Sequence, residues 1–160
     1  MKLTRSFLLS TLITPTLLWS SVTLSAAVKQ EQLYGKWQCI HHFSEPNQNI
    51  SIKVDYTIEL MKNKTSVGKG DLFFTMGGLP PFAYKESDSS LWDLQGNLLT
   101  LQSTAIGFVN ISHPELEQVL NLQQLFPKHI KETVEVVSVS AQQIKVASSS
   151  HGKAYTCDKM

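Results

Sequence analysis

Arginine is almost missing from the sequence. Arg5 is the only one in 160 residues, and it lies close to the N-terminus. The chain beyond residue 27 therefore has no guanidinium group for a bidentate contact with a phosphate, a carboxylate or a guanine edge. The lysines are scattered singly, and once Lys2 and Arg5 are set aside the basic residues no longer outnumber the 13 acidic ones. We expect no nucleic-acid binding, because that needs clustered basic side chains.

Common catalytic and metal-binding patterns are missing as well. The sequence has no Cys-x-x-Cys, no Gly-x-Ser-x-Gly, no His-x-His and no His-Glu-x-x-His. His41 and His42 are adjacent, so in a strand they point to opposite faces and do not chelate one ion. The sequence predicts no enzyme, no metal site and no cofactor.

A long uninterrupted apolar run is also missing. Residues 1–27 have the form of a secretory signal, with Lys2 and Arg5 first, an apolar stretch over 7–19 and small residues up to Ala27. The apolar stretch contains polar residues and a proline and is shorter than the ~20 residues of a membrane span. An uncleaved anchor is the alternative. We predict cleavage after Ala27 and a periplasmic or secreted protein that does not span the membrane.

Only two cysteines are present, Cys39 and Cys157. In an exported protein an even number of cysteines indicates disulfide bonds, and two cysteines allow one pairing. Such a bond would enclose most of the chain beyond the leader and, on the chain-entropy account, stabilise the fold by up to ~5 kcal/mol. The sequence predicts a disulfide that ties the first strand to the last.

What the sequence does have is alternation. Over 50–60 every even position is apolar and every odd position is polar, a pattern typical of a long antiparallel strand with one buried face. A turn at 62–64 leads into a return strand over 65–76, where Gly68 and Gly70 indicate a bulge or a close backbone approach. In the strand that opens the domain, Trp37, Cys39 and His41 share a face.

The remaining segments complete an all-β fold. Further strands are expected over 90–94, 98–102, 133–140, 144–148 and 154–159, and a phase slip between Val136 and Val137 predicts a bulge. A capping-box pattern at 112–115 and helical spacing after it predict one short helix over 113–124. We therefore predict a single domain over 28–160, an antiparallel barrel of about eight strands with one short helix.

Three stretches carry a family resemblance: Leu33-Tyr34-Gly35-Lys36-Trp37, the hairpin over 91–99 and the closing Tyr155-Thr156-Cys157. Together they resemble lipocalin-like small exported bacterial proteins. In lipocalins the Gly-x-Trp of the first strand closes the base of the barrel, and its tryptophan packs against an arginine from a late strand. The resemblance implies that Trp37 closes this barrel and that Lys159 stands in for the arginine.

The function expected from these observations is non-catalytic binding of a small apolar ligand inside the barrel. The apolar loop Met76 to Phe82 is a candidate lip of the barrel mouth, and it is equally a candidate plug. If side chains fill the barrel, the alternative is a protein-interaction or inhibitor module of the cell envelope that uses this loop or the helix. We expect a monomer. The candidate ligand-binding residues are Trp37, Tyr56, Ile58, Phe74, Met76, Leu79, Phe82 and Trp92.

Overall fold

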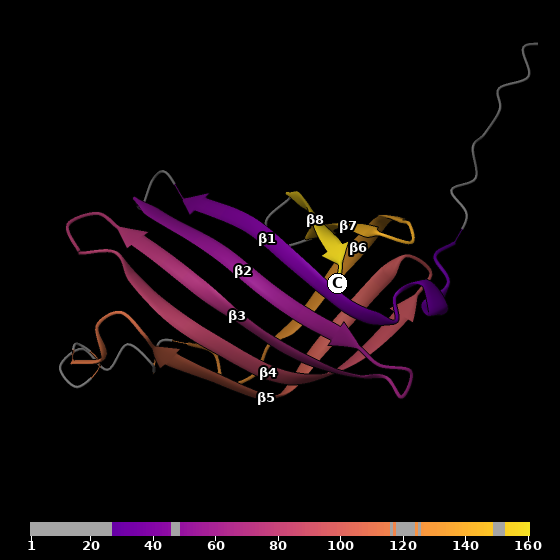
Figure 1. The fold of residues 1–160 in the computed structure, drawn as a ribbon, viewed down its shortest axis with the longest axis horizontal. Helices are drawn as coiled ribbons and strands as arrows, with labels where there is room; N and C mark the ends of the chain where they lie inside the picture. The colour runs from indigo at the N-terminus through magenta and orange to yellow at the C-terminus, as the bar shows by residue number, and fades with distance from the viewer. Residues whose placement is uncertain (1–26, 46–48, 116, 118–123, 125, 149–152) are drawn as a thin grey trace, which may run out of the picture.

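The structure is a computed structural model that describes residues 27–45, 49–115, 117, 124, 126–148 and 153–160. Eight strands form one closed barrel in which every strand is antiparallel to its neighbours in the chain, and β8 returns to β1 (Figure 1). This confirms the predicted all-β, eight-stranded antiparallel barrel. The elements are η1 (Gln30–Gln32), β1 (Gly35–Glu45), β2 (Ile50–Leu60), β3 (Thr65–Met76), β4 (Phe82–Gln95), β5 (Leu98–Asn110), β6 (Lys131–Val139), β7 (Gln143–Ser148) and β8 (Ala154–Lys159).

Several predicted strands are found where the alternation placed them. The strand expected over 50–60 is β2, the one expected over 65–76 is β3 and the one expected over 154–159 is β8. The register of β6 against β7 shifts between Val136 and Ser138, at the predicted bulge. Alternation identifies these strands because one face of each packs inside the barrel while the other meets water.

Two predicted strands were too short, and one predicted helix is not tested. The strands expected over 90–94 and 98–102 are the parts of β4 and β5 next to the turn that joins them. Both strands continue away from this turn, to Phe82 and to Asn110, as a long hairpin. The helix predicted over 113–124 falls mostly on residues outside the described part of the chain. Within the described residues, Asn110 rather than a capping box organises 110–113, because its side-chain oxygen accepts hydrogen bonds from the backbone N–H groups of Ser112 and His113.

Gly68 and Gly70 make a close approach rather than a bulge. The β2–β3 register runs without a shift through both residues. A Cβ atom at Gly68 would overlap the hydroxyl group of Tyr56, and one at Gly70 would lie 2.5 Å from the backbone oxygen of Asp55. The two glycines therefore leave the space in which the Tyr56 ring lies against β3.

The barrel is closed unevenly along its length. β1 and β2 pair along their whole length, from Gly35 opposite Leu60 to Glu45 opposite Ile50. In the described part of the chain, β8 pairs with β1 only over 37–39, and β6 pairs with β5 only over 98–102. We call the end with these pairings the base, and the opposite end, where β1, β3 and β5 finish, the mouth. The long strands β1 to β5 extend beyond β6 to β8 toward the mouth (Figure 1).

Candidate functional site

The base is filled by an apolar cluster, which we call the base cluster. Its buried members are Leu33, Trp37, Cys39, Leu60, Trp92, Leu99, Val134, Val136, Ile144, Val146 and Cys157. Trp37 is 1% exposed, and its indole N–H donates to the backbone oxygen of Leu33 at 2.8 Å. The Lys159 ammonium lies 4.0 Å from the centre of the Trp37 ring and donates to the backbone oxygen of Tyr34. A lysine therefore makes the contact for which lipocalins use an arginine, and burial lowers its pKa.

The predicted disulfide lies in the same cluster. Cys39 and Cys157 are bonded, with Cα atoms 4.2 Å apart and both side chains buried. They are directly opposite each other in the short β1–β8 pairing. The bond therefore fastens the seam at which the barrel closes.

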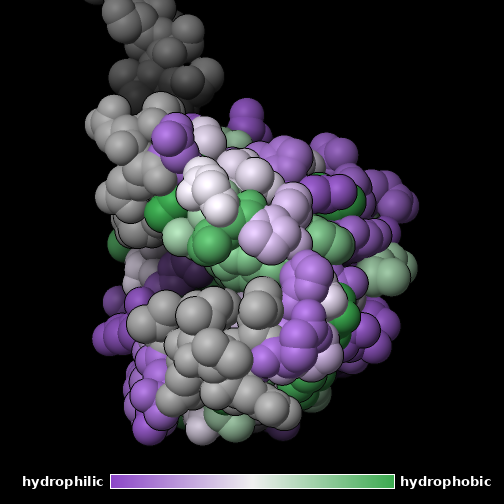
Figure 2. Space-filling model, turned by 90° about the vertical axis from the view of Figure 1, so that its left-hand side faces the viewer, coloured by the Kyte–Doolittle hydropathy of each residue, from purple (hydrophilic) through white to green (hydrophobic). Residues whose placement is uncertain are grey.

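A second cluster, the mouth cluster, is aromatic. Its buried members are Val54, Leu72, Tyr84 and Phe108, and Phe74, Phe82 and Phe126 pack against them. Phe126, from the segment between β5 and β6, stacks on Phe108 with ring centres 4.2 Å apart and meets Tyr84 edge-on at 4.7 Å. Figure 2 looks onto this end and shows apolar side chains beside a hollow in the surface.

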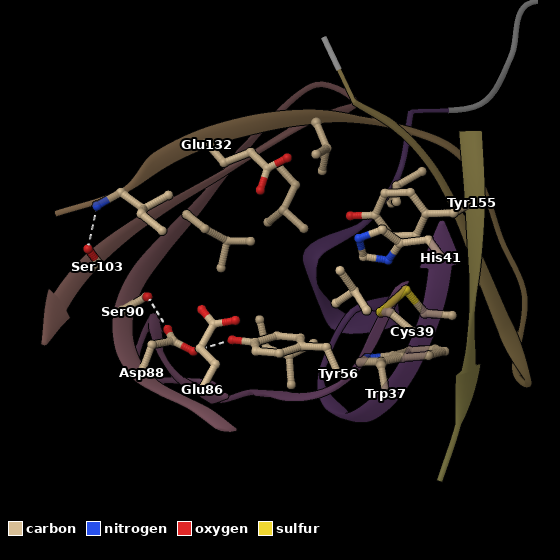
Figure 3. A pocket seen from close by; sticks show the side chains of 18 of the residues that line it. Trp37, Cys39, His41, Tyr56, Glu86, Asp88, Ser90, Ser103, Glu132 and Tyr155 are labelled. Carbon is tan, nitrogen blue, oxygen red and sulfur yellow. Dashed lines mark hydrogen bonds between the residues drawn. A yellow bond between two sulfur atoms is a disulfide. The ribbon is translucent and has the colours of Figure 1, made fainter. Parts of the chain in front are cut away.

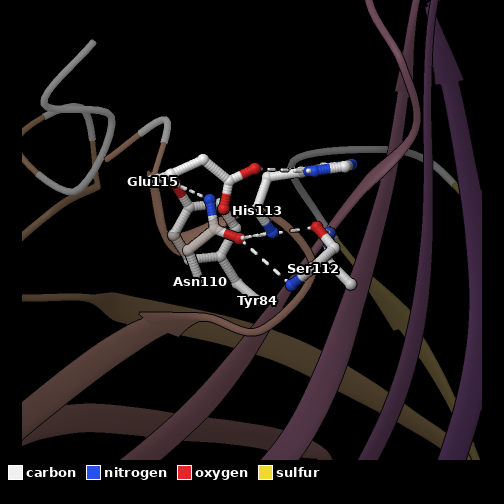
Figure 4. A network of polar contacts seen from close by, with 6 residues as sticks. Tyr84, Asn110, Ser112, His113 and Glu115 are labelled. Atoms are coloured by element: carbon white, nitrogen blue, oxygen red, sulfur yellow. Dashed lines mark hydrogen bonds and ion pairs between the residues drawn. The ribbon is translucent and has the colours of Figure 1, made fainter. Parts of the chain in front are cut away.

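Polar contacts fix the outer end of the mouth cluster (Figure 4). The Tyr84 hydroxyl donates to Glu117 at 2.6 Å and accepts from the Asn110 amide at 3.4 Å. Burial, followed by the hydrogen bond to Glu117, raises the pKa of Tyr84 to about 12. Ser112 accepts from the backbone N–H of Ala83 at 2.8 Å, which links the end of β5 to the start of β4. These bonds hold the residues after β5 against the mouth.

A cavity of about 320 Å³ lies between the two clusters. Most of its wall is apolar and comes from both clusters, including Trp37, Ile58, Leu72 and Val146. Its volume is at the lower end of the range for small-molecule pockets, which is roughly 300 to 1,000 Å³. The barrel interior is therefore open rather than filled by its own side chains.

Three carboxyl groups enter this largely apolar cavity. Glu86 and Asp88 project from β4, and Glu132 projects from the β6 side of the cavity (Figure 3). One Asp88 oxygen accepts a hydrogen bond from the Tyr56 hydroxyl, and the other accepts from Ser90 at 2.6 Å. Glu132 accepts from the Ser148 hydroxyl at 3.4 Å. Among the described residues, the Glu86 carboxyl group has no hydrogen-bond or ion-pair partner.

Burial changes the acid–base properties of this group of side chains. It raises the pKa of Glu86 from 4.5 to about 7, with the charges of Asp88 and then Glu132 as the next causes. Burial also raises the pKa of Tyr56, with its hydrogen bond to Asp88 second. The pKa of Tyr155 is raised by burial and then by the charge of Glu132. Both tyrosines therefore stay neutral phenols at any physiological pH.

Aromatic rings form the wall beside the carboxyl groups. His41 stacks on Tyr155 with ring centres 4.4 Å apart and meets Phe43 edge-on at 4.6 Å. All three rings line the cavity, and Tyr56 adds a fourth. Figure 3 shows Tyr155 and His41 together on one side, with Glu86 and Glu132 approaching the same space from opposite walls. This arrangement offers one small molecule both apolar surface and negative charge.

The predicted site residues separate into four places. Trp37, Tyr56 and Ile58 line the cavity. Phe74 and Phe82 belong to the mouth cluster, where their rings stack with centres 5.1 Å apart, and Met76 is the last residue of β3. Trp92 is buried in the base cluster, and its N–H is shared by the backbone oxygens of Met61 and Thr65. Leu79 is 49% exposed at the tip of the loop between β3 and β4.

Sequence reasoning missed the polar residues of the cavity. A signal for them was present, because the even positions of the segment over 82–94 read Phe, Tyr, Glu, Asp, Ser, Trp and Leu. The aromatic residues at both ends of this series place its whole face inside the barrel, and Glu86 and Asp88 share that face. The acids interrupt the apolar pattern, so alternation predicts this strand only from residue 90 onward.

Comparisons with known proteins do not assign the chain to a family. No family model matches the sequence, and none of the curated proteins compared with it matches. The closed antiparallel barrel is compatible with the lipocalin-like fold that the sequence resembles. None of the helices in the described residues has the length and apolar character needed to cross a membrane. In the same residues, no group of three or more His, Cys, Asp or Glu is arranged to hold a metal ion.

Proposed function

We propose that this protein is a non-catalytic binding protein that holds a small, largely apolar molecule inside its barrel. The observation that supports this most directly is the cavity of about 320 Å³ between the base and mouth clusters. An empty apolar cavity of this size leaves the surrounding side chains without packing partners, which costs stability. A bound ligand would restore those packing contacts and so stabilise the folded protein.

The architecture around the cavity supports the same proposal. The base is closed by Trp37, Lys159 and the disulfide, so a ligand enters from the mouth half, where β8 and β1 are not paired in the described residues. The aromatic rings of the mouth cluster then lie between the bound ligand and solvent. A closed end and an aromatic end are what a barrel needs to keep an apolar molecule out of water.

Fluorescence titration tests the proposal. A neutral apolar probe, N-phenyl-1-naphthylamine, should bind saturably with enhanced emission, and octanol should displace it. The variant Ile58→Trp fills the cavity wall with a larger side chain and should abolish the signal, whereas Ile40→Trp adds the same ring at a position 53% exposed and should leave the signal intact. Absence of saturable binding to the unmodified protein would overturn the proposal and favour the protein-interaction alternative.

We also propose that the protein is exported. The Cys39–Cys157 disulfide supports this, because such bonds persist in oxidising compartments. The secretory form of residues 1–27 supports it independently. N-terminal sequencing of the protein from cells that make it should begin at Val28, and the two cysteines should resist alkylation before reduction. A cytoplasmic protein that retains Met1 and two free thiols would contradict the proposal.

A further inference from the structure

The inward faces of β4 and β6 carry three carboxyl groups that line the cavity. Along β4 the inward residues run from the aromatic Tyr84 through Glu86, Asp88 and Ser90 to Trp92, which is 2% exposed. Glu86 and Asp88 therefore lie in the middle of an inward face whose end residues, Tyr84 and Trp92, are buried in the core. Glu132 approaches the same space from the β6 side, in the opposite wall (Figure 3).

No basic side chain in the cavity lining balances this charge except His41. Among the described residues that line the cavity there is no lysine. The lysines next to the acids on their own strands face outward: Lys85 on β4 is exposed and 3.9 Å from Asp71, and Lys131 on β6 is exposed. Strand alternation places them on the other side of the sheet from the cavity.

Carboxyl groups inside an apolar cavity are costly unless they are hydrogen-bonded or paired with a positive charge. Asp88 receives two hydroxyl hydrogen bonds and Glu132 receives one. Glu86 receives none from the described residues, and the charges of Asp88 and Glu132 act against its ionised form. A positively charged ligand group placed among these side chains would be attracted to all three carboxylates, and the described cavity lining offers no lysine for that role.

We infer that the ligand is an organic cation, an apolar molecule that carries a protonated amine between Glu86, Asp88 and Glu132. This inference rests on the proposed function of the cavity and specifies its ligand class. A metal ion fits less well, because the three carboxyl groups are not arranged to hold one. Tyr56 and Tyr155 line the same cavity and stay neutral, so they add aromatic surface without a competing charge.

The pKa of Glu86 makes the binding dependent on pH. With a value of about 7, the Glu86 carboxyl group is mostly charged at pH 8.5 and mostly neutral at pH 5.5. The titratable groups that share its space are His41 of β1, Tyr56 of β2, Asp88 of β4, Glu132 of β6 and Tyr155 of β8. The residues directly opposite Glu86, Gly70 on β3 and Phe108 on β5, do not titrate. Affinity for an amine should therefore fall as the pH falls below 7.

Three probes with one carbon chain and different head groups test the inference. Octylamine, octanol and octanoate compete with bound N-phenyl-1-naphthylamine at pH 8.5 and at pH 5.5. At pH 8.5 octylamine should bind at least about tenfold more tightly than octanol, because an ion pair with a buried carboxylate is worth that much. Octanoate should bind most weakly. At pH 5.5 the ratio of octylamine to octanol affinity should fall several-fold.

Two variants and one competing ion complete the test. Glu86→Gln should lower the ratio of octylamine to octanol affinity at pH 8.5, whereas Glu135→Gln, an exposed glutamate on β6, should leave it as in the unmodified protein. Calcium chloride should not displace octylamine. If octanol binds and octylamine binds no more tightly, or if calcium competes, the cation inference is wrong while the binding function stands. If none of the three probes binds, the binding function itself fails.

Discussion

In the described residues, the first and last strands pair at the base of the barrel but not at the mouth. The base combines the β1–β8 pairing, the disulfide and the stacked Lys159–Trp37 pair around an apolar cluster. The mouth relies on aromatic rings that pack across β2 to β5 and on Phe126 from the segment after β5. Between the two clusters, the cavity wall carries the carboxyl groups of Glu86, Asp88 and Glu132, which belong to neither cluster. The comparison indicates that stability is concentrated at the base and binding chemistry in the middle.

Truncating one large ring in each cluster should show this difference most strongly. Trp37→Ala should lower the free energy of unfolding by about 3 to 5 kcal/mol, because the side chain is 1% exposed and surrounded by the base cluster. Phe74→Ala should cost about 2 kcal/mol, because Phe74 is only partly buried in the mouth cluster. Urea unfolding followed by far-ultraviolet circular dichroism measures both. Equal losses would remove the distinction between the two ends.

The disulfide tests the base in a second way. The double variant Cys39→Ala, Cys157→Ala should lose about 2 to 4 kcal/mol, because the bond joins residues separated by 118 positions and its removal frees the unfolded chain. The unmodified protein in excess dithiothreitol should unfold at nearly the same urea concentration as the variant. If the oxidised protein and the variant were equally stable, the strand pairing and Trp37 alone would account for closure of the base.

The base is also the region that the sequence predicted best. Trp37, Cys39 and His41 were assigned to one face of β1, and the two cysteines had only each other as partners. The contact between Lys159 and Trp37 followed from the resemblance to lipocalins. These features are predictable because they depend on residue types with few alternatives: a single cysteine pair, a Gly-x-Trp and strict alternation.

The middle of the barrel was predicted poorly for a physical reason. Sequence patterns locate an inward strand face by its apolar residues, and Glu86 and Asp88 on the inward face of β4 break that rule. Glu132 is likewise one of two acids on β6, and only the closed barrel brings it toward β4. The candidate list therefore held the apolar part of the lining, Tyr56 and Ile58 among it, and none of the carboxyl groups.

The smallest expected effect is the stability change of Glu86→Gln. Since the folded state raises the pKa of Glu86 from 4.5 to about 7, the folded protein holds a proton that the unfolded chain releases. The stability associated with this proton is present below pH 4.5 and is lost as the pH rises through 7. Because the carboxyl group still faces the open cavity, we expect a loss of about 1 kcal/mol rather than the full value of the shift.

Glutamine has the same shape and no charge, so Glu86→Gln should match the unmodified protein at pH 4.5 and exceed its stability by about 1 kcal/mol at pH 8. Glu135→Gln, on the exposed face of β6, should show no such pH-dependent gain. Urea unfolding of all three proteins at both pH values measures the difference. A gain at pH 8 would mean that the fold tolerates Glu86 rather than requires it, as expected of a residue kept for binding. A loss of stability at pH 8 would show that Glu86 supports the barrel as Trp37 does. The cavity region would then contribute to stability as the base does.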